Sequence, residues 1–117
     1  MQYITEIESY HHNNKRSAVT LGKFNGLHRG HQRLIQEICR YAREDINSIV
    51  FAFDMGKQSL LTQRERRKHL EYLVDVFIQC PFTREIRTME AETFIKDILV
   101  DRLKVAYMVV GTDFHFG

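Results

Sequence analysis

The sequence has few of the residues that mark secreted, metal-binding or membrane-spanning proteins. Its 117 residues include two cysteines, one proline and no tryptophan. Cys39 and Cys80 lack metal-ligand spacing, and a single pair cannot form the disulfide framework of a small secreted domain. Residues 1–16 contain no apolar signal-peptide core, and no run approaches the roughly 18 apolar residues of a spanning helix. We therefore expect a cytoplasmic protein that is neither exported nor inserted in a membrane.

An excess of one charge is also lacking. Seventeen basic and fifteen acidic side chains leave a net charge of +2, too little to recruit nucleic acid or an anionic membrane by itself. The basic run Arg64–His69 is interrupted by Glu65 and has no interleaved aromatic residues, which favours a solvated helix face. His11 and His12 have no cysteine or carboxylate at metal spacing. These patterns predict no nucleic-acid partner, no membrane partner and no metal site formed by the protein.

Four short segments rich in β-branched or aromatic residues recur about every thirty residues, the length of a βαβ unit. They are Ala18–Leu21, Ile49–Phe53, Val76–Cys80 and Val105–Val110. Within the last three, the runs IVFAF, VFI and AYMVV are apolar without alternation, as in strands that helices cover on both faces. The sequence therefore predicts a parallel sheet.

Helical periodicity fills the connections between these strands. Between the first two, one face carries Leu34, Ile35, Ile38 and Ala42, and the other carries Arg33, Glu37 and Arg40. A capping-box pattern from Thr62 to Glu65 predicts the start of a second helix, whose end we place near Leu73. The third helix is predicted from its apolar side: Phe94, Ile95, Ile98, Leu99 and Leu103.

The predicted order β-α-β-α-β-α-β, with right-handed crossovers, is one half of a doubly wound, Rossmann-like α/β sheet. An apolar share of 44% and a charged share of 27% fit one globular domain over residues 1–117. The final strand would present an open sheet edge, which predicts a tendency to form homo-oligomers.

The most informative segment is GKFNGLHRGH, Gly22 to His31, between the first strand and the first helix. That junction lies at the carboxyl edge of an α/β sheet, where ligands bind. Gly22 and Gly26 allow backbone to approach a ligand, Gly30 lets the helix start pack near the sheet, and first-turn amides cradle phosphate. His28 and His31, three residues apart, face the same side of that turn. The competing interpretation is a tight turn with two surface histidines.

This segment resembles the motif of the HxGH nucleotidyltransferases, above all that of the FAD synthetase family, GxFDGxHxGH. Six positions match: Gly22, Phe24, Gly26, His28, Gly30 and His31. Asn25 stands where the family has aspartate. The resemblance continues through LLT at Leu60–Thr62 and through VVGTDFHFG at Val109–Gly117, which is similar to VVGxDFxFG. It spans nearly the whole chain and implies an HxGH-type Rossmann-like fold.

The resemblance also implies the reaction, in which FMN and ATP give FAD and pyrophosphate. His28 and His31 would hydrogen-bond the ATP phosphates, with Mg²⁺ held mostly by the nucleotide and Phe24 touching it. Lys23 would add a cation or remain solvated. Replacing a carboxylate by Asn25 would weaken the orientation of a histidine or a metal-bound water.

At the other end of the chain, Gly111 would let backbone approach the adenine. Asp113, Phe114 and Phe116 would shape the nucleotide or flavin site, unless they are ordinary packing residues at a strand end.

Two parts of the family pattern have no counterpart in the chain: the ISSTxIR-like signature that holds ATP from the far side, and the riboflavin kinase module. The resemblance is therefore to a partial FMN adenylyltransferase domain, truncated on its C-terminal side, with weak or no turnover alone. Two alternatives remain open. One is another HxGH enzyme that adenylates or cytidylates a different phosphorylated acceptor, and the other is a non-catalytic nucleotide-binding domain.

Overall fold

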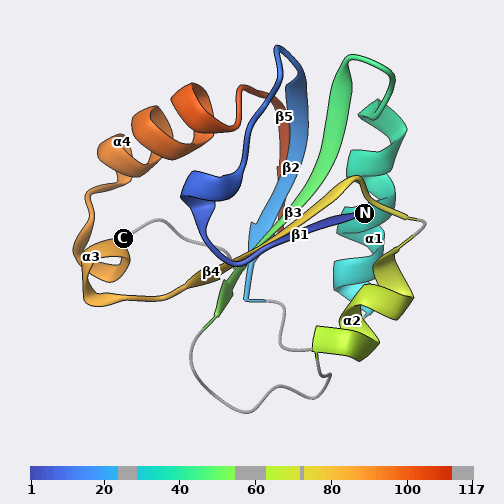
Figure 1. The fold of residues 1–117 in the computed structure, drawn as a ribbon, viewed down its shortest axis with the longest axis horizontal. Coiled ribbons are helices and arrows are strands. Elements are labelled where there is room, and N and C mark those ends of the chain that lie inside the picture. Colours follow the sequence, from blue (N-terminus) through green and yellow to red (C-terminus); the bar gives the residue numbers. More distant parts are fainter. Residues whose placement is uncertain (24–28, 55–62, 72, 112–117) are drawn as a thin grey trace.

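Five parallel strands form the central sheet of the computed structural model, which describes residues 1–23, 29–54, 63–71 and 73–111 (Figure 1). Their spatial order is β1-β4-β3-β2-β5, and every neighbouring pair is parallel. The strands are β1 (Gln2–Ile4), β2 (Arg16–Gly22), β3 (Ile46–Asp54), β4 (Val76–Pro81) and β5 (Val105–Val110). The predicted parallel sheet is confirmed, and all four predicted strands are present.

Helices cover both faces of the sheet (Figure 1). On one face lie α1 (Arg29–Tyr41) and α2 (Gln63–Leu70), whose Ile38 and Leu70 pack with Ala18 and Val50 of the strands. On the other face lie the short helix η1 (Ile7–Ser9), α3 (Arg84–Thr88), α4 (Ala91–Phe94) and its continuation η2 (Ile95–Arg102). This arrangement is the predicted doubly wound α/β fold.

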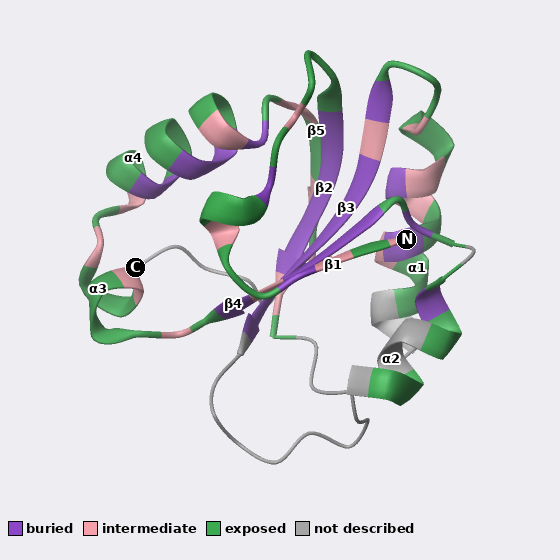
Figure 2. Cartoon of the chain, in the orientation of Figure 1, coloured by how far each residue is buried: buried purple, intermediate pink, exposed green. Residues whose placement is uncertain are grey.

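The central strands are buried on both faces (Figure 2). Along β2 the side chains alternate: Val19 and Leu21 join the core beneath η2, whereas Ala18 joins the core beneath α1. In β3 every residue from Ile49 to Phe53 is buried. The apolar runs of the sequence therefore identified two-sided burial correctly for the middle of the sheet.

Strand β5 does not follow that expectation. It lies at the edge of the described sheet, and Tyr107, Met108 and Val110 remain 40%, 43% and 37% exposed. The ring of Tyr107 stacks on Tyr41 of α1, with centroids 4.3 Å apart. An apolar sequence allows a strand to be buried on both faces. Whether it is buried depends on the position of the strand in the sheet.

The helix boundaries agree with the sequence patterns in most places. Ile35 and Ile38 are buried while Arg33 and Arg40 are exposed, as predicted for α1. Helix α2 begins at Gln63 and ends at Leu70, and β4 begins at Val76, so the predicted boundary near Leu73 is confirmed. Thr62, the predicted cap, lies outside the described residues.

The third predicted helix differs in its winding. From Ile95 to Arg102 it is a π-helix, and the Leu103 amide donates to the Ile98 carbonyl oxygen at 2.9 Å, five residues back. Ile98 and Leu99 are buried, but Ile95, the first residue of the π-helix, is 40% exposed. The prediction that Ile95 lies on the apolar side is therefore wrong.

Three described elements were not predicted at all, namely the three-residue strand β1, the three-residue helix η1 and the five-residue helix α3. All three are shorter than the windows over which hydrophobic periodicity can be recognised. Helix α3 is nonetheless capped by a specific contact, since Thr83 Oγ1 accepts from the Ile86 amide at 3.3 Å.

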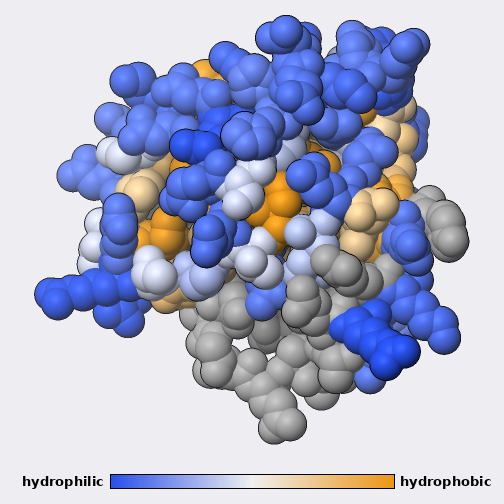
Figure 3. All heavy atoms as spheres, viewed as in Figure 1, coloured by the Kyte–Doolittle hydropathy of each residue, from blue (hydrophilic) through white to orange (hydrophobic). Residues whose placement is uncertain are grey.

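The face of the molecule seen in Figure 3 is mainly hydrophilic, with apolar side chains showing only between polar ones over its described part. Within the described ranges, no helix has both the length and the apolar character to cross a membrane.

Candidate nucleotide-binding site

The sheet reverses its winding direction between β2 and β5. From β2 the chain passes through α1 to β3 on one face, whereas it enters β5 through α4 and η2 on the opposite face (Figure 1). The adjacent ends of two such strands form a topological switch point, the usual position of ligands in open α/β sheets. The sequence did not predict the spatial order of the strands. The structure therefore adds that Gly22, the first residue of the motif, lies at the switch point.

Two of the predicted site residues meet at this point. Leu21 of β2 is in register with Val110 of β5, so Gly22 and Gly111 leave neighbouring strands side by side at the carboxyl edge. Lys23 follows Gly22 and is exposed there. The backbones of two segments nearly ninety residues apart in the sequence therefore lie next to each other at the carboxyl edge of the sheet.

The remaining predicted site residues are described only in part or not at all. Gly30 and His31 lie in the first turn of α1, and their side-chain environment is outside the description. Outside the described residues lie Phe24, Asn25, Gly26, His28, Asp113, Phe114 and Phe116. The convergence of the two imidazoles therefore stays a prediction.

The amino end of α1 has the electrostatics of an anion site. The helix is 13 residues long and begins at Arg29, and it is the next described element after β2, which ends at Gly22. A helix N-terminus carries partial positive charge and unpaired amides, and its first turn normally favours acidic side chains. The first turn of α1 has no acidic residue and contains Arg29 and His31 instead. That composition is unfavourable for an isolated helix, and a bound phosphate would offset it.

Comparison with known proteins decides the family. A profile of the FAD synthetase family matches residues 10–117. The chain belongs to the FAD synthetase family.

Curated relatives agree with this assignment. The chain is 33% identical over 111 residues to the bifunctional riboflavin kinase/FMN adenylyltransferase of Escherichia coli strain K12, covering 85% of this chain and 36% of that protein. The protein of the same name from Haemophilus influenzae is 34% identical over 112 residues, covering 86% and 36%. The one from Buchnera aphidicola subsp. Schizaphis graminum is 27% identical over the whole chain and 41% of its own length. The chain thus spans about two fifths of the length of these relatives.

A solved structure supports the fold. The crystal structure of a Streptococcus pneumoniae protein, titled a macrolide-efflux protein, superposes with a TM-score of 0.81 at 23% identity, covering 98% of this chain and 42% of that one. At this identity the similarity bears on the fold alone.

In this member of the FAD synthetase family, the cysteine and tyrosine groups with shifted pKa values lie away from the switch point. Burial raises the pKa of the Cys80 thiol to about 11, and burial also raises the pKa values of Cys39 and Tyr10. A raised pKa keeps each of these groups protonated and unreactive at neutral pH. Among the described residues there is also no group of three His, Cys, Asp or Glu side chains that could hold a metal ion.

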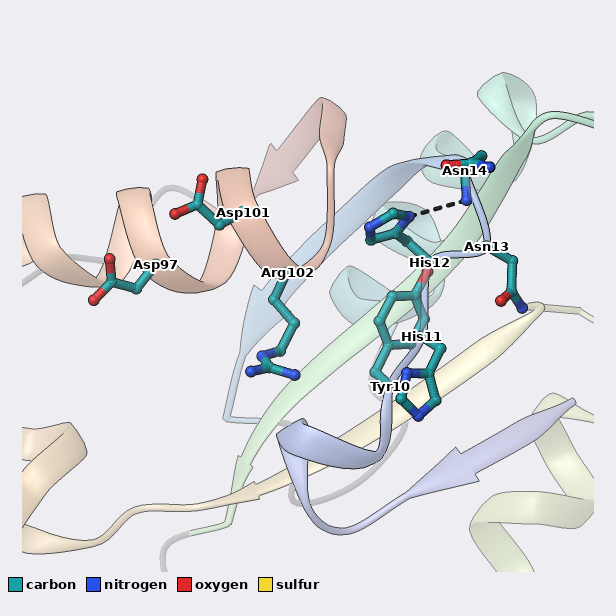
Figure 4. Close-up of a pocket in the computed structure, with 8 residues that line it drawn as sticks. All are labelled: Tyr10, His11, His12, Asn13, Asn14, Asp97, Asp101 and Arg102. Atoms are coloured by element: carbon teal, nitrogen blue, oxygen red, sulfur yellow. Dashed lines mark hydrogen bonds between the residues drawn. The ribbon is translucent and has the colours of Figure 1, made fainter.

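Sequence reasoning missed a hollow of about 470 Å³ between the segment Tyr10–Asn14 and helix η2 (Figure 4). Its lining residues are Tyr10, His11, His12, Asn13, Asn14, Asp97, Asp101 and Arg102. The hollow lies beside the amino ends of β2 and β5, at the opposite end of the strands from Gly22 and Gly111. His12 Nδ1 accepts from the Asn14 amide at 3.0 Å, which uses one ring nitrogen within the loop itself. The hollow is therefore separate from the switch point.

Proposed function

We propose that this chain carries the ATP-phosphate half of an FMN adenylyltransferase site, which transfers AMP from ATP to FMN to give FAD and pyrophosphate. The observation that carries the proposal is the position of GKFNGLHRGH, which leaves β2 at the switch point and leads into the amino end of α1. Family membership and the names of the curated relatives support it. We further propose that the protein works in the cytoplasm on small-molecule substrates, with no nucleic-acid or membrane partner.

The chemistry is an in-line displacement at phosphorus. A phosphate oxygen of FMN attacks the α-phosphorus of ATP, a new P–O bond forms, and the bond to the leaving pyrophosphate breaks with its electron pair. No covalent enzyme intermediate is required, so catalysis is mainly positioning and charge neutralisation. ATP would bring Mg²⁺ as its own counterion.

Each part of the site has a distinct task in this scheme. His28 and His31 would donate hydrogen bonds to the phosphates and to the charge that develops on pyrophosphate. The first-turn amides of α1 would bind the same anion, and exposed Lys23 would add a cation at the strand end. Gly111, beside Gly22, would let the backbone approach the adenine. Asp113, Phe114 and Phe116 would follow it toward the base or the flavin.

The purified chain, incubated with FMN, ATP and Mg²⁺, tests the proposal directly. We expect calorimetric binding of ATP and formation of FAD that chromatography detects. Transfer of a nucleotide to an acceptor other than FMN would favour another HxGH enzyme. ATP binding without transfer to any acceptor would favour a non-catalytic nucleotide-binding domain, and absence of ATP binding would contradict the proposal altogether.

Asn25→Asp is expected to raise turnover about 10-fold, because a carboxylate orients a neighbouring histidine or a metal-bound water better than an amide. The measurement is the steady-state rate of FAD formation at saturating ATP and FMN. Asn13→Asp, the same change in an exposed turn at the far end of the strands, serves as control and should leave the rate unchanged. An unchanged rate for Asn25→Asp would show that this position needs no anion.

We also propose that the β5 edge pairs with a second copy of this chain. β5 is six residues long and uncharged, and it exposes Tyr107, Met108 and Val110, whereas the opposite edge strand, β1, has only three residues. A long apolar edge without charge or proline lacks the features that prevent strand pairing. Antiparallel pairing about a two-fold axis would place Lys104 near Gly111 of the partner and so avoid opposing like charges.

Met108→Lys is expected to shift the chain to a monomer, because it places a charge in the centre of the edge. Light scattering after size exclusion, at several concentrations, measures the mass. Leu73→Lys changes an apolar residue that is even more exposed (56% against 43% for Met108); it lies before β4, away from β5, and the change should leave the mass unchanged. A wild-type chain that is monomeric at high concentration would refute the proposal.

A further inference from the structure

The hollow beside η2 contains charged side chains that no described part of the protein neutralises. Arg102 lines it together with Asp97 and Asp101. None of these three side chains forms an ion pair or a hydrogen bond with another residue in the described part of the chain. A guanidinium that is partly withdrawn from water is normally paired with an anion. The hollow therefore presents charge that an outside molecule can use.

The π-helical winding of η2 brings these three side chains to one side of the helix. A turn closed by a hydrogen bond five residues back contains about four to five residues, so Asp97, Asp101 and Arg102 lie almost above one another. In an α-helix, with about 3.6 residues per turn, Arg102 would lie about 140° around the axis from Asp97. Such winding is uncommon, and where it occurs it is often at a functional site. The winding thus builds one wall of the hollow.

The opposite wall presents a hydrogen-bond donor in a fixed orientation. Asn13 and Asn14 have left-handed backbone, with φ of 51° and 62°, and the Lys15 amide closes this turn on the His12 carbonyl oxygen at 2.8 Å. Within the turn, the Asn14 amide donates to His12 Nδ1 at 3.0 Å. A ring nitrogen that accepts carries no hydrogen, so the hydrogen of the neutral imidazole lies on Nε2. In Figure 4 this second nitrogen is on the side of the ring that faces η2.

The polar groups of the hollow lie at different depths. Arg102 and His12 are half-buried, whereas Asp97 and Asp101 are exposed, and Tyr10 at the base is 2% exposed. The donors therefore lie deeper than the two carboxylates, which stand at the rim. The volume of about 470 Å³ is within the range of small-molecule sites, about 300–1,000 Å³.

We propose that this hollow binds a small phosphorylated molecule that also carries hydroxyl groups: its phosphate lies between Arg102 and His12, and its hydroxyls donate to Asp97 and Asp101. Phosphate oxygens accept from several directions, which suits donors on two facing walls, whereas a single guanidinium satisfies both oxygens of a carboxylate. Hydroxyl groups supply the donors that the rim carboxylates lack. Because the hollow lies at the opposite end of the strands from Gly22 and Gly111, the inference does not depend on the proposed function.

Calorimetric titration of the full chain with ribose 5-phosphate, inorganic phosphate and ribose tests the proposal. Ribose 5-phosphate, which has both kinds of group, is expected to bind at least about 10-fold more tightly than inorganic phosphate, and ribose should not bind detectably. Arg102→Gln should weaken binding of ribose 5-phosphate at least about 10-fold. Lys96→Gln is the matched control, because it removes the same charge from an exposed position of η2 outside the lining of the hollow, and it should keep the affinity within about 2-fold.

Asp101→Asn separates the two halves of the site, and the exposed position of Asp101 makes a packing defect a poor explanation for its effect. It should weaken binding of ribose 5-phosphate about 3-fold. Inorganic phosphate should bind the same variant as tightly as wild type or more tightly, because a nearby negative charge has been removed. A general loss of structure would weaken both ligands together.

Several results would overturn the proposal. They are absence of ribose 5-phosphate binding at millimolar concentration, equal affinities for ribose 5-phosphate and inorganic phosphate, and equal losses in Arg102→Gln and Lys96→Gln. His28→Ala distinguishes this site from the proposed nucleotide site, and it should leave the affinity for ribose 5-phosphate unchanged. Loss of that affinity in His28→Ala would place the binding at the nucleotide site and refute a second one.

Discussion

Replacing His28 by alanine is expected to lower the rate of FAD formation by about 100-fold or more, the usual loss when one donor to a developing oxyanion is removed. The imidazole would strengthen its hydrogen bond as charge builds on the leaving pyrophosphate. Catalytic turnover should therefore fall more than the KM for ATP rises. Initial rates over a range of ATP concentrations, with FAD quantified by chromatography, separate the two parameters.

His31→Ala should give a loss of similar size, and the double variant should be little worse than either single one, because the two groups act on one anion. His69→Ala is the control, since it removes an exposed histidine from α2. A rate within about 2-fold of wild type for His28→Ala would remove the imidazole from the mechanism. The proposal would then depend on the helix amides and Lys23 alone.

Phe51→Ala is expected to lower the free energy of unfolding by about 3–5 kcal/mol. Phe51 is fully buried in β3, and its ring lies 5.3 Å from that of Phe53 and 5.9 Å from that of Phe94, both in edge-to-face geometry. The substitution removes these contacts and leaves a cavity between the sheet and α4. Because small domains are stable by only about 5–15 kcal/mol, much of the chain should unfold near physiological temperature.

Urea titration followed by circular dichroism measures this loss. Leu73→Ala, a large-to-small change at a residue that is 56% exposed, should change the free energy of unfolding by less than about 0.5 kcal/mol. A loss below about 1 kcal/mol in Phe51→Ala would mean that the rings around it close the cavity, and that the described core packing is wrong.

The fold was largely predictable because buried parallel strands have an unusual sequence. Ile49–Phe53 is apolar at every position, which few other structures accommodate, and the structure places it at the centre of the sheet. The order of the strands was not predictable, since nothing in β5 itself states that it lies beside β2 rather than β4. The π-helical winding of η2 was also missed, because Phe94, Ile98 and Leu103 fit a helix of either width.

The location of the candidate site could be predicted from local sequence, because the segment Gly22–His31 was expected between a strand and a helix, and β2 ends at Gly22 while α1 begins at Arg29. The roles of its glycines and histidines stay a prediction. The hollow beside η2 could not be found in this way, because it joins Tyr10–Asn14 to a helix near the other end of the chain.

The adjacency of β2 and β5 also constrains how the molecule comes together. Strand β2 can pair with β3 as soon as residue 54 is available, but its other side has no partner until residues 105–110 arrive. Joining strands so distant in sequence is entropically slow, and synthesis proceeds from the N-terminus. One flank of β2 therefore stays unpaired until residues 105–110 have been synthesised, and Gly111 takes its place beside Gly22 only after β2 has been able to pair with β3.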